Sequence, residues 1–485
     1  MAFAASSEAP AAPESGAAAG GSDPSGEEPM TGRDFAVPGF CSRGDRPARA
    51  QGKDLRKQVS RADHDRFAPA ADRPAVIDVV EQANEGRLPH LVPLRIGRMV
   101  ATPFAFLRGS AGLMAADLAN TPVTGVHAQI CGDAHAGNFG LFGSADGRLV
   151  MDVNDFDETV PGPWEWDLKR LAASLVVAGR VGGAAEDVCR AAARDAAETY
   201  RRTLALLAGM PVLQAWQAIA DESLVWHAEA HDLTGHLEQV SAKARKNTSA
   251  KVAARSTVEL EDGRRRFVPD PPVLTTVDDA TAEAVAQSLA GYVQTLSPDR
   301  RPMFGRFVVE DVAFRVVGTG SVGLRAYVVM LEGSGDEPLV LQVKESRRSA
   351  LAPYLGIGDA EHEGRRVVFG QKVMQAVTDT LLGWTTVGDR HFMVRQFRNM
   401  KGSIDASTLP AEQLDDYGRM TGALLARAHS HSVDPKLLAG YCGKSTKLDE
   451  AVAAFAVAYA DQTERDHEEL VAAVKAGRLP AETGV

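Results

Sequence analysis

The sequence has 485 residues, of which 45% are hydrophobic and 24% are charged, so it is long enough to form more than one packed domain. Its net charge of -11 argues against a basic surface for nucleic acid, and we expect no nucleic-acid partner. The absence of a CxxC pair argues against a disulfide framework and a zinc ribbon. The absence of an apolar run of bilayer length argues against a membrane partner, and without a secretory pattern we expect a cytoplasmic location.

The first 125 residues divide into a polar tail and an extension. Residues 1–34 are rich in Ala, Gly, Ser, Pro and Glu. Such a composition buries too little apolar surface to offset the entropy of ordering, so we expect a disordered tail. Residues 35–125 are predicted to form an N-terminal extension of helices and loops. Arg95, Arg98 and Arg108 interleave with apolar residues there, and such arginines pair with structural carboxylates or with phosphates of a ligand.

Residues 126–304 are predicted to form a helical lobe that carries the catalytic loop. Apolar residues recur on one face of a helix predicted over residues 163–179, which Gly179 ends. An Ala- and Leu-rich helical pattern continues over residues 184–240. Residues 241–270 are polar and basic, and we expect a mobile loop there.

The pattern becomes β-rich over residues 305–400, which we expect to be a nucleotide-clamping lobe. "FVVEDVAF", "LRAYVVMLEG" and "EPLVLQVKE" read as strands, and "GWTTVG" and "HFMVRQF" read as a strand pair. Residues 401–485 are predicted to return as helices to the helical lobe. The predicted fold class is therefore α+β with two lobes.

A loop of small residues, "CGDAHAGNFGLF" (131–142), carries Asp133, His135 and Asn138, and the acidic cluster "DVNDFDE" follows a short strand. Neighbouring carboxylates and a carboxamide form the oxygen-rich site that Mg²⁺ prefers. In kinase-type phosphoryl transfer a loop Asp is the base, an Asn five residues later binds the metal, and a strand-end Asp completes the site. We therefore expect Asp133 and His135 to be catalytic, and Asn138 and Asp155 to bind Mg²⁺. The alternative is that these residues only form turns.

The segment "GTGSVG" (318–323) satisfies the GxGxxG pattern. A strand pattern follows it, whereas the glycines of a dinucleotide fold open a helix. We therefore expect a flap over the phosphates of a nucleotide, with an ordinary hairpin as the alternative. The residues assigned to the flap are Gly318, Gly320, Ser321 and Gly323.

Lys344 ends the apolar strand "LVLQVKE" after the flap and can reach the α- and β-phosphates. It needs a carboxylate to orient it, and Glu345, Glu361 and Glu363 are the candidates, of which we favour Glu363. A strand-end lysine in solvent is the alternative. We expect the adenine to lie against "HFMVRQF", with the backbone of Arg395, Gln396 and Phe397 as its hinge. ATP and Mg²⁺ are the expected cofactors.

The run "GDAHAGNFGLF…DGRLVMDVNDFDETVPGPWEWDL" resembles the catalytic segment of aminoglycoside phosphotransferase and choline-kinase-like proteins, which have the protein-kinase-like fold. The resemblance implies that Asp133 is the base, that Asn138 and Asp155 bind metal, that Asp157 is a further ligand and that Asp167 braces the catalytic loop. Asp152 competes with Asp155 for the metal position. From about residue 35 onward the chain resembles the bacterial domain-of-unknown-function 2252 family, through stretches such as "LVPLRIGRM", "NDFDET", "GRRVVFGQ" and "YADQTERD".

The order of the parts departs from the kinase-like pattern, because the flap and Lys344 follow the catalytic loop instead of preceding it. The helix pattern "YGRMTGALLARAHSHS" near the C-terminus resembles the helix that enters the catalytic loop in those proteins. We therefore expect a circular permutation, which requires residues 411–432 to lie against residues 126–138.

The expected function is transfer of the γ-phosphoryl group of ATP to a hydroxyl of a small molecule or, less in keeping with the pattern, of a protein. Three alternatives stay open. They are AMP transfer by an inverted nucleotide, a non-catalytic nucleotide-binding pseudokinase, and a structural protein that binds a partner.

Overall fold

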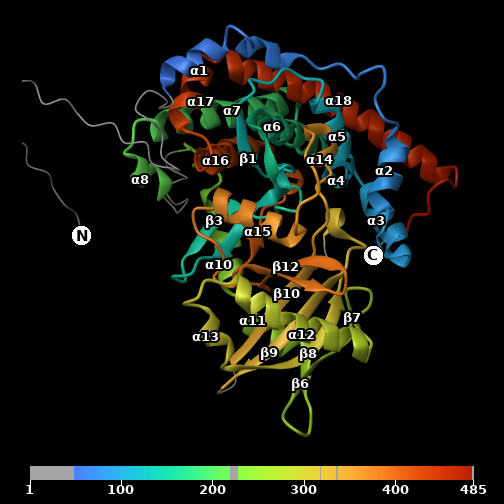
Figure 1. The fold of residues 1–485 in the computed structure, drawn as a ribbon. Coiled ribbons are helices and arrows are strands. Elements are labelled where there is room, and N and C mark those ends of the chain that lie inside the picture. Colours follow the sequence, from blue (N-terminus) through green and yellow to red (C-terminus); the bar gives the residue numbers. More distant parts are fainter. Residues whose placement is uncertain (1–47, 219–227, 317, 335–336, 483–485) are drawn as a thin grey trace, which may run out of the picture. The chain divides into compact units, whose positions relative to one another are not determined.

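The computed structural model describes residues 48–218, 228–316, 318–334 and 337–482 (Figure 1). The strands of these residues form separate antiparallel sheets. The largest sheet has the strand order β11-β12-β10-β9-β8-β7. Its strands are β7 (Leu274–Thr276), β8 (Phe307–Arg315), β9 (Ala326–Gly333), β10 (Glu337–Glu345), β11 (Gly383–Val387) and β12 (Arg390–Gln396). Strands predicted within residues 305–400 are thus confirmed.

The two central strands of this sheet, β9 and β10, are buried on both faces. On one face Val329 and Leu341 pack against Tyr292 of helix α12 (Asp279–Thr295). On the other face Val328 and Val340 pack in a cluster with Ala253 of helix α11 (Ser249–Ser256). Successive residues of a strand point to opposite faces, so covering both faces produces the nearly continuous apolar runs seen in the sequence.

The large sheet and the helix that covers it extend across the domain boundary expected between residues 304 and 305. β7 pairs with β8, and α12 packs on β11, although both β7 and α12 precede residue 305. The expected mobile loop at residues 241–270 is instead helix α11 followed by the hairpin of β5 (Thr257–Glu259) and β6 (Arg265–Phe267). Helix α11 forms because its small residues, with Ala253 buried, cover the sheet, a tertiary contact that local polarity does not reveal.

Most of the described residues outside the large sheet form helices. The helix predicted from residue 163 is α6, although it continues two residues past Gly179. The bounds of the long helices are α6 (Trp164–Val181), α7 (Glu186–Leu207), α10 (Thr234–Arg245), α15 (Glu363–Met374), α16 (Ala411–Ser430) and α18 (Lys447–Lys475). None of the helices in the described ranges is both long and apolar enough to cross a bilayer.

Helices α16 and α7 pack closely because small residues face one another. Gly418 lies against the backbone of Ala192, and Gly422 lies against that of Ala196, so a Cβ at either glycine would overlap the neighbouring carbonyl. The spacing of four residues in both helices puts the two contacts on one face of each. Because the two backbones are this close, the buried side chains of α7 and α16 form one continuous core with those of α6.

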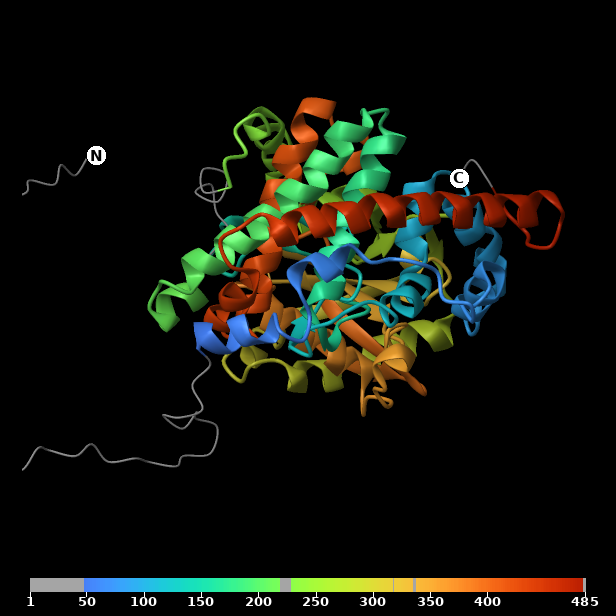
Figure 2. The same cartoon turned by 90° about the horizontal axis from the view of Figure 1, so that it is seen from above.

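Shorter helices lie at the N-terminal side of the described chain, and several pack on the C-terminal half of α18 (Figures 1 and 2). Val80, Ile96, Leu113 and Leu470 belong to this shared cluster. The bounds of the short helices are α1 (Arg49–Leu55), α2 (Val76–Asn84), α3 (Val92–Met99), α4 (Pro103–Gly109), α5 (Ala111–Leu118), α8 (Val212–Trp216), α13 (Arg301–Phe304), α14 (Ala352–Leu355) and α17 (Pro435–Cys442).

Two small sheets bring distant parts of the chain to one place. β1 pairs with β4, and β2 lies between β3 and β13. Their bounds are β1 (His127–Ile130), β2 (Phe139–Gly143), β3 (Leu149–Val153), β4 (Val160–Pro163) and β13 (Gly402–Ser403). The predicted contact between residues 411–432 and 126–138 is formed, because Tyr417 Oη donates to the carbonyl of Ala136 at 2.5 Å and Ser432 Oγ accepts from the N–H of Gln129 at 2.8 Å.

The domain bounds expected at residues 125, 304 and 400 do not separate independent bodies, since the described residues from Ala48 onward belong to one compact unit. The expected tail at residues 1–34 lies outside the described residues.

A buried histidine makes stability depend on pH. His64 is buried, its Nε2 lies 2.6 Å from Tyr441 Oη, and burial, followed by the charge of Lys169, lowers its pKa to about 3. The unfolded chain therefore takes up a proton at this residue below about pH 6.5 while the folded chain does not. We expect the free energy of unfolding to fall by up to about 1.4 kcal/mol per pH unit between about pH 6.5 and pH 3 because of this residue.

Urea unfolding at several pH values measures this slope. His64→Gln should lose this part of the slope, and the exposed His90→Gln should keep it. Equal slopes for the wild type and His64→Gln would contradict the assignment.

Candidate functional site

A buried carboxylate holds the loop of small residues that precedes β2. Asp167, in the first turn of α6, accepts hydrogen bonds from the N–H of Cys131 (2.7 Å) and of Gly132 (2.9 Å). Gly132 has φ of +80°, and a Cβ there would collide with the backbone of Glu158. The loop therefore needs glycine at this position. Asp167 thus fixes the backbone of the loop at Cys131 and Gly132.

Asp133 is the carboxylate at the centre of this loop. Its Oδ1 accepts a hydrogen bond from Arg170 Nε at 2.5 Å. Burial raises the pKa of Asp133 to about 7, although the charge of Arg170 opposes this shift. A carboxylate with a pKa near neutrality is matched to accepting a proton from a hydroxyl at physiological pH.

His135 lies beside Asp133, with its Nε2 3.7 Å from Asp133 Oδ2. Its Nδ1 accepts a hydrogen bond from the N–H of Gly137 at 3.1 Å. Burial, followed by the charges of Arg108 and Arg170, holds the pKa of His135 well below its ordinary value. The ring is therefore neutral, and its hydrogen is on Nε2, the nitrogen that faces Asp133.

The β2–β3 hairpin places Asn138 and Asp155 at the same end. Phe139 pairs with Val153, so the residues just outside the hairpin are adjacent, and the N–H of Asn154 donates to the carbonyl of Asn138 at 3.0 Å. Asn138 Nδ2 donates to the carbonyl of Asp133 at 2.7 Å, which fixes the amide and leaves its Oδ1 without a hydrogen bond among the described residues. The side chain of Asp155 is 43% exposed. Burial opposes ionisation of Asp155, but the charges of Lys344, Arg395 and Lys401 hold its pKa below the ordinary value.

Asp152, the competitor of Asp155 for a metal, is buried in a different environment. Its Oδ1 accepts from Arg427 Nη2 at 2.5 Å, and its Oδ2 accepts from the N–H of Ala376 at 3.4 Å. Asp152 does not line either of the two cavities described below, whereas Asp155 lines both. Asp152 therefore connects β3 to α16 and α15, and Asp155 is the carboxylate available for a ligand.

Lys344 comes from the large sheet to the acidic cluster. Its Nζ is 2.5 Å from Asp157 Oδ2 and 3.7 Å from Asp155 Oδ1, and its side chain is 6% exposed. Burial opposes the charge of Lys344, but the two carboxylates raise its pKa above the ordinary value. Ser321 of the glycine segment donates to the same Asp157 Oδ2 at 3.0 Å. Three regions that are distant in sequence thus meet at one carboxylate.

The favoured pairing of Lys344 with Glu363 does not occur in the structure, because Glu363 accepts from Arg366 Nε at 2.5 Å. Glu361 pairs with Arg365. Glu345, the third candidate, faces away from Lys344 and pairs with Arg325 and Arg390, since successive residues of a strand point to opposite faces. Lys344 is oriented instead by the acidic cluster itself.

The glycine segment joins β8 to β9 through a 3₁₀ turn, η5 (Thr319–Ser321). Gly323, with φ of +85°, packs against the side chain of Arg87, and its carbonyl accepts from the N–H of Leu88 at 2.8 Å. The far end of the segment is thus anchored to the chain between α2 and α3. Gly318 and Gly320 border the larger cavity described below, and Gly320 also borders the smaller one.

The expected hinge at Arg395, Gln396 and Phe397 also borders the larger cavity, but its backbone groups are occupied. The N–H of Gln396 donates to Asp379 Oδ2 at 2.7 Å, and the N–H of Phe397 donates to the carbonyl of Val340 at 2.8 Å. Ser249 Oγ donates to the carbonyl of Phe397 at 3.0 Å. These two N–H groups and the Phe397 carbonyl are therefore not free to bind a base.

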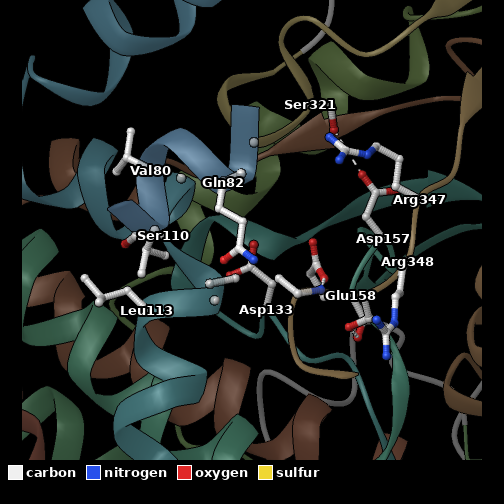
Figure 3. Close-up of a pocket in the computed structure, with 18 of the residues that line it drawn as sticks. Val80, Gln82, Ser110, Leu113, Asp133, Asp157, Glu158, Ser321, Arg347 and Arg348 are labelled. Carbon is white, nitrogen blue, oxygen red and sulfur yellow. Dashed lines mark hydrogen bonds between the residues drawn. The ribbon is translucent and has the colours of Figure 1, made fainter. Parts of the chain in front are cut away.

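Two cavities meet at Asp133 and Asp155. The larger, of about 500 Å³, lies between the loop of residues 131–142, the large sheet and the β12–β13 connection. The smaller, of about 320 Å³, reaches toward α2 and α5. Figure 3 shows Asp157, Arg347 and Ser321 grouped on one side of the smaller cavity, across from Val80, Ser110 and Leu113. The residues common to both cavities are Asp133, Asp155, Arg108, Gly320 and Ser321.

Comparison with protein families gives one match, to a family described as uncharacterized proteins conserved in bacteria (DUF2252), over residues 87–473. The chain belongs to this family. The match includes every lining residue of the larger cavity, and it begins after the α2 residues of the smaller one. No curated protein and no solved structure matches the chain.

Three basic residues of this DUF2252 chain were missed by the sequence analysis. Arg170 holds Asp133, and its position one helical turn after Asp167 is a signal that could have identified it. Arg366 donates to the carbonyls of Asp157 (2.8 Å) and Thr159 (2.6 Å), which fixes the loop that carries the acidic cluster. Lys401 lines the larger cavity, and the charge of Arg395, followed by burial, lowers its pKa to about 7. No sequence pattern marks Lys401.

The buried Asp152–Arg427 pair gives a test of its structural role. Arg427→Met leaves the Asp152 carboxylate buried without its partner, and we expect the free energy of unfolding to fall by about 3–5 kcal/mol. Urea unfolding measures the change. Arg365→Met, which removes an exposed pair with Glu361, is the matched control and should cost about 1 kcal/mol or less. Equal losses in the two variants would be inconsistent with a buried pair.

Proposed function

We propose that this DUF2252 chain is an ATP- and Mg²⁺-dependent phosphotransferase with a circularly permuted kinase-like fold. The observation that carries the proposal is the convergence at Asp157. The Lys344 ammonium, from the large sheet, and the Ser321 hydroxyl, from the glycine segment that joins β8 to β9, reach the acidic cluster that follows the catalytic loop. Such a lysine and a glycine-rich segment bind phosphates in kinases, and the carboxylates bind the accompanying metal.

The topology of the large sheet supports the proposed fold. A glycine segment joins the antiparallel strands β8 and β9, and the next strand, β10, carries Lys344 near its end, followed by helix α15. This is the order of glycine loop, strand lysine and following helix in protein kinases. The C-terminal end of α16 lies beside β1, where a kinase chain would enter its catalytic loop. Permutation accounts for both observations, since it changes the chain order and keeps the contacts.

The larger cavity is lined by positively charged side chains, which a triphosphate needs for binding. Arg98, Arg108, Arg315, Lys344, Arg395, Arg398 and Lys401 line it, against the carboxylates of Asp133, Asp155 and Asp379. Its volume of about 500 Å³ is within the range of small-molecule sites. Leu141, Phe142, Val316 and Phe397 supply apolar surface for a base.

The residues present also fit a magnesium ion. No cluster of three or more His, Cys, Asp or Glu side chains placed for a metal is found within the described ranges, but Mg²⁺ needs only one or two carboxylates together with phosphates and water. Asn138 Oδ1, Asp155 and Asp157 would hold it. The ion would neutralise charge that develops on the phosphates during transfer.

Asp133 would act on the acceptor. Arg170 fixes one of its oxygens and leaves the carboxylate at the junction of the two cavities, where an acceptor hydroxyl and a γ-phosphate would meet. Its carboxylate would take the proton of that hydroxyl. Orientation of the two reactants and the surrounding positive charges would supply most of the rate enhancement.

Removal of Lys344 tests the nucleotide site. Lys344→Ala should weaken binding of a non-hydrolysable Mg·ATP analogue by about tenfold or more, because a charge-assisted contact to phosphate is lost. The analogue should raise the Tm of the wild type by mass action. Lys436→Ala, at an exposed position on α17, is the control and should bind like the wild type. Undiminished affinity in Lys344→Ala would count against the proposal.

Removal of the Asp133 charge tests the base. Asp133→Asn should keep nucleotide affinity and lose about 10²–10⁴-fold in transfer rate. Transfer is measured as label moving from γ-labelled ATP to small molecules of a bacterial extract, with the exposed Asp389→Asn as control. Label moving from the α-phosphate instead would identify nucleotidyl transfer. Nucleotide binding without any transfer would identify a pseudokinase.

A further inference from the structure

The smaller cavity contains arginines without carboxylate partners. Arg87, Arg95, Arg108 and Arg347 line it, and none of their guanidinium groups forms an ion pair with a carboxylate of the described chain. Buried or half-buried guanidinium groups are normally paired, because a charge removed from water is costly unless another charge compensates for it. Glu158, Asp157 and Glu345 act on Arg87 only at longer range, so direct ion-pair positions at the four guanidinium groups are left for a ligand.

The contacts that position these arginines are to neutral atoms. Arg95 is 1% exposed, and it donates to Asn84 Oδ1 at 3.0 Å and to the carbonyl of Gly109 at 2.8 Å. Its Nε has no hydrogen-bond partner, and neither does the buried Nε of Arg108. Arg87 donates to the carbonyls of Ala83 (2.8 Å) and Val322 (2.6 Å). The guanidinium groups of Arg87 and Arg95 are thus fixed in place by neutral atoms and have no ion-pair partner.

Most of the carboxylates that line the same cavity have hydrogen-bond or ion-pair partners of their own. Glu345 pairs with Arg325 and Arg390, and Glu158 accepts from the N–H of Ala350 at 2.6 Å. Asp157 binds Lys344, and Asp133 binds Arg170. Burial, followed by the charges of Arg87 and Arg347, lowers the pKa of Arg95 well below its ordinary value. The guanidinium groups thus repel one another across the cavity.

We infer that the smaller cavity is the acceptor site and that its ligand is a small hydroxylated anion, held at its phosphate or carboxylate group by the arginines. This inference rests on the proposed function. With the anionic end at Arg87, Arg95 and Arg347, the hydroxyl end reaches Asp133, which the cavity shares with the nucleotide side. A cationic acceptor is disfavoured by the same four charges.

The proposed transfer forms one bond and breaks one. The acceptor oxygen forms a bond to the γ-phosphorus, and the bond from that phosphorus to the β,γ-bridging oxygen breaks. ADP leaves with the electron pair, and the hydroxyl proton passes to Asp133. A volume of about 320 Å³ suits a molecule of a few carbon atoms. Val80 and Leu113 cover its apolar part, and Gln82 and Ser110 offer hydrogen bonds.

Anion binding can be measured without knowledge of the acceptor. Inorganic phosphate and malonate serve as probes in calorimetry with the full chain, with a non-hydrolysable Mg·ATP analogue present at saturation to fill the larger cavity. Arg347→Ser is the main variant, because its side chain makes no hydrogen bond or ion pair within the described residues and its removal should not disturb folding. Arg365→Ser, an exposed arginine paired with Glu361, is the control.

We expect saturable binding of at least one probe by the wild type and by Arg365→Ser, and a loss of about tenfold or more in Arg347→Ser. Tighter binding of phosphate identifies a phosphate ester as the acceptor class, and tighter binding of malonate identifies a carboxylate. Arg347→Lys, which keeps the charge, should retain part of the affinity.

The inference is overturned if neither probe binds the wild type, if Arg347→Ser binds the probe as the wild type does, or if choline or glycerol competes with the bound anion at equal concentration. These outcomes are separate from failure of the proposed function. If Lys344→Ala and the wild type bind the nucleotide analogue equally, the proposed function fails. The anion measurement repeated without the analogue then still decides the arginine site.

Discussion

The site depends on one ion pair, between Lys344 at the end of β10 and the carboxylates of Asp155 and Asp157. It connects the large sheet to a loop that belongs to the helical part of the chain. Because the lysine is almost fully buried, loss of the two carboxylates would leave its ammonium group without a charged partner in a poorly solvated environment. The pair therefore joins the large sheet to the loop of the acidic cluster at the border of both cavities.

Most elements of the fold were predictable, because their signals are local. The strands of residues 307–345 and helices α6, α16 and α18 show apolar patterns that match their burial. Short elements whose stability comes from tertiary contact were not predictable. Helix α11 is polar in sequence, and it forms because it covers the sheet. The boundary near residue 305 was misplaced for the same reason, since β7 is three residues long and is defined only by its pairing with β8.

The candidate site was predictable as a set of acidic residues but not as a network. The spacing from Asp133 to Asn138 and the "NDFDE" cluster predict a group of oxygen-bearing side chains, and Asp133, Asn138 and Asp155 line the same cavity. The basic residues that bind these carboxylates were not predicted from the sequence. Arg170 and Arg366 follow carboxylates by three residues on their helices, and arginines at that spacing are common on surface helices. Which arginine turns inward depends on packing, so Glu363 was favoured as the partner of Lys344 although it binds Arg366 in the structure.

The close contact of α7 with α16 has a consequence for synthesis of the chain. Helix α16 begins about 200 residues after α7 ends, and α18 follows later still. At ribosomal rates of roughly 5–20 residues per second, the apolar faces of α6 and α7 wait for ten seconds or more before their partners emerge. During that interval the small-residue face of α7 has no α16 to pack against. Assembly of the helical part therefore waits for segments that are made about 200 residues after α7.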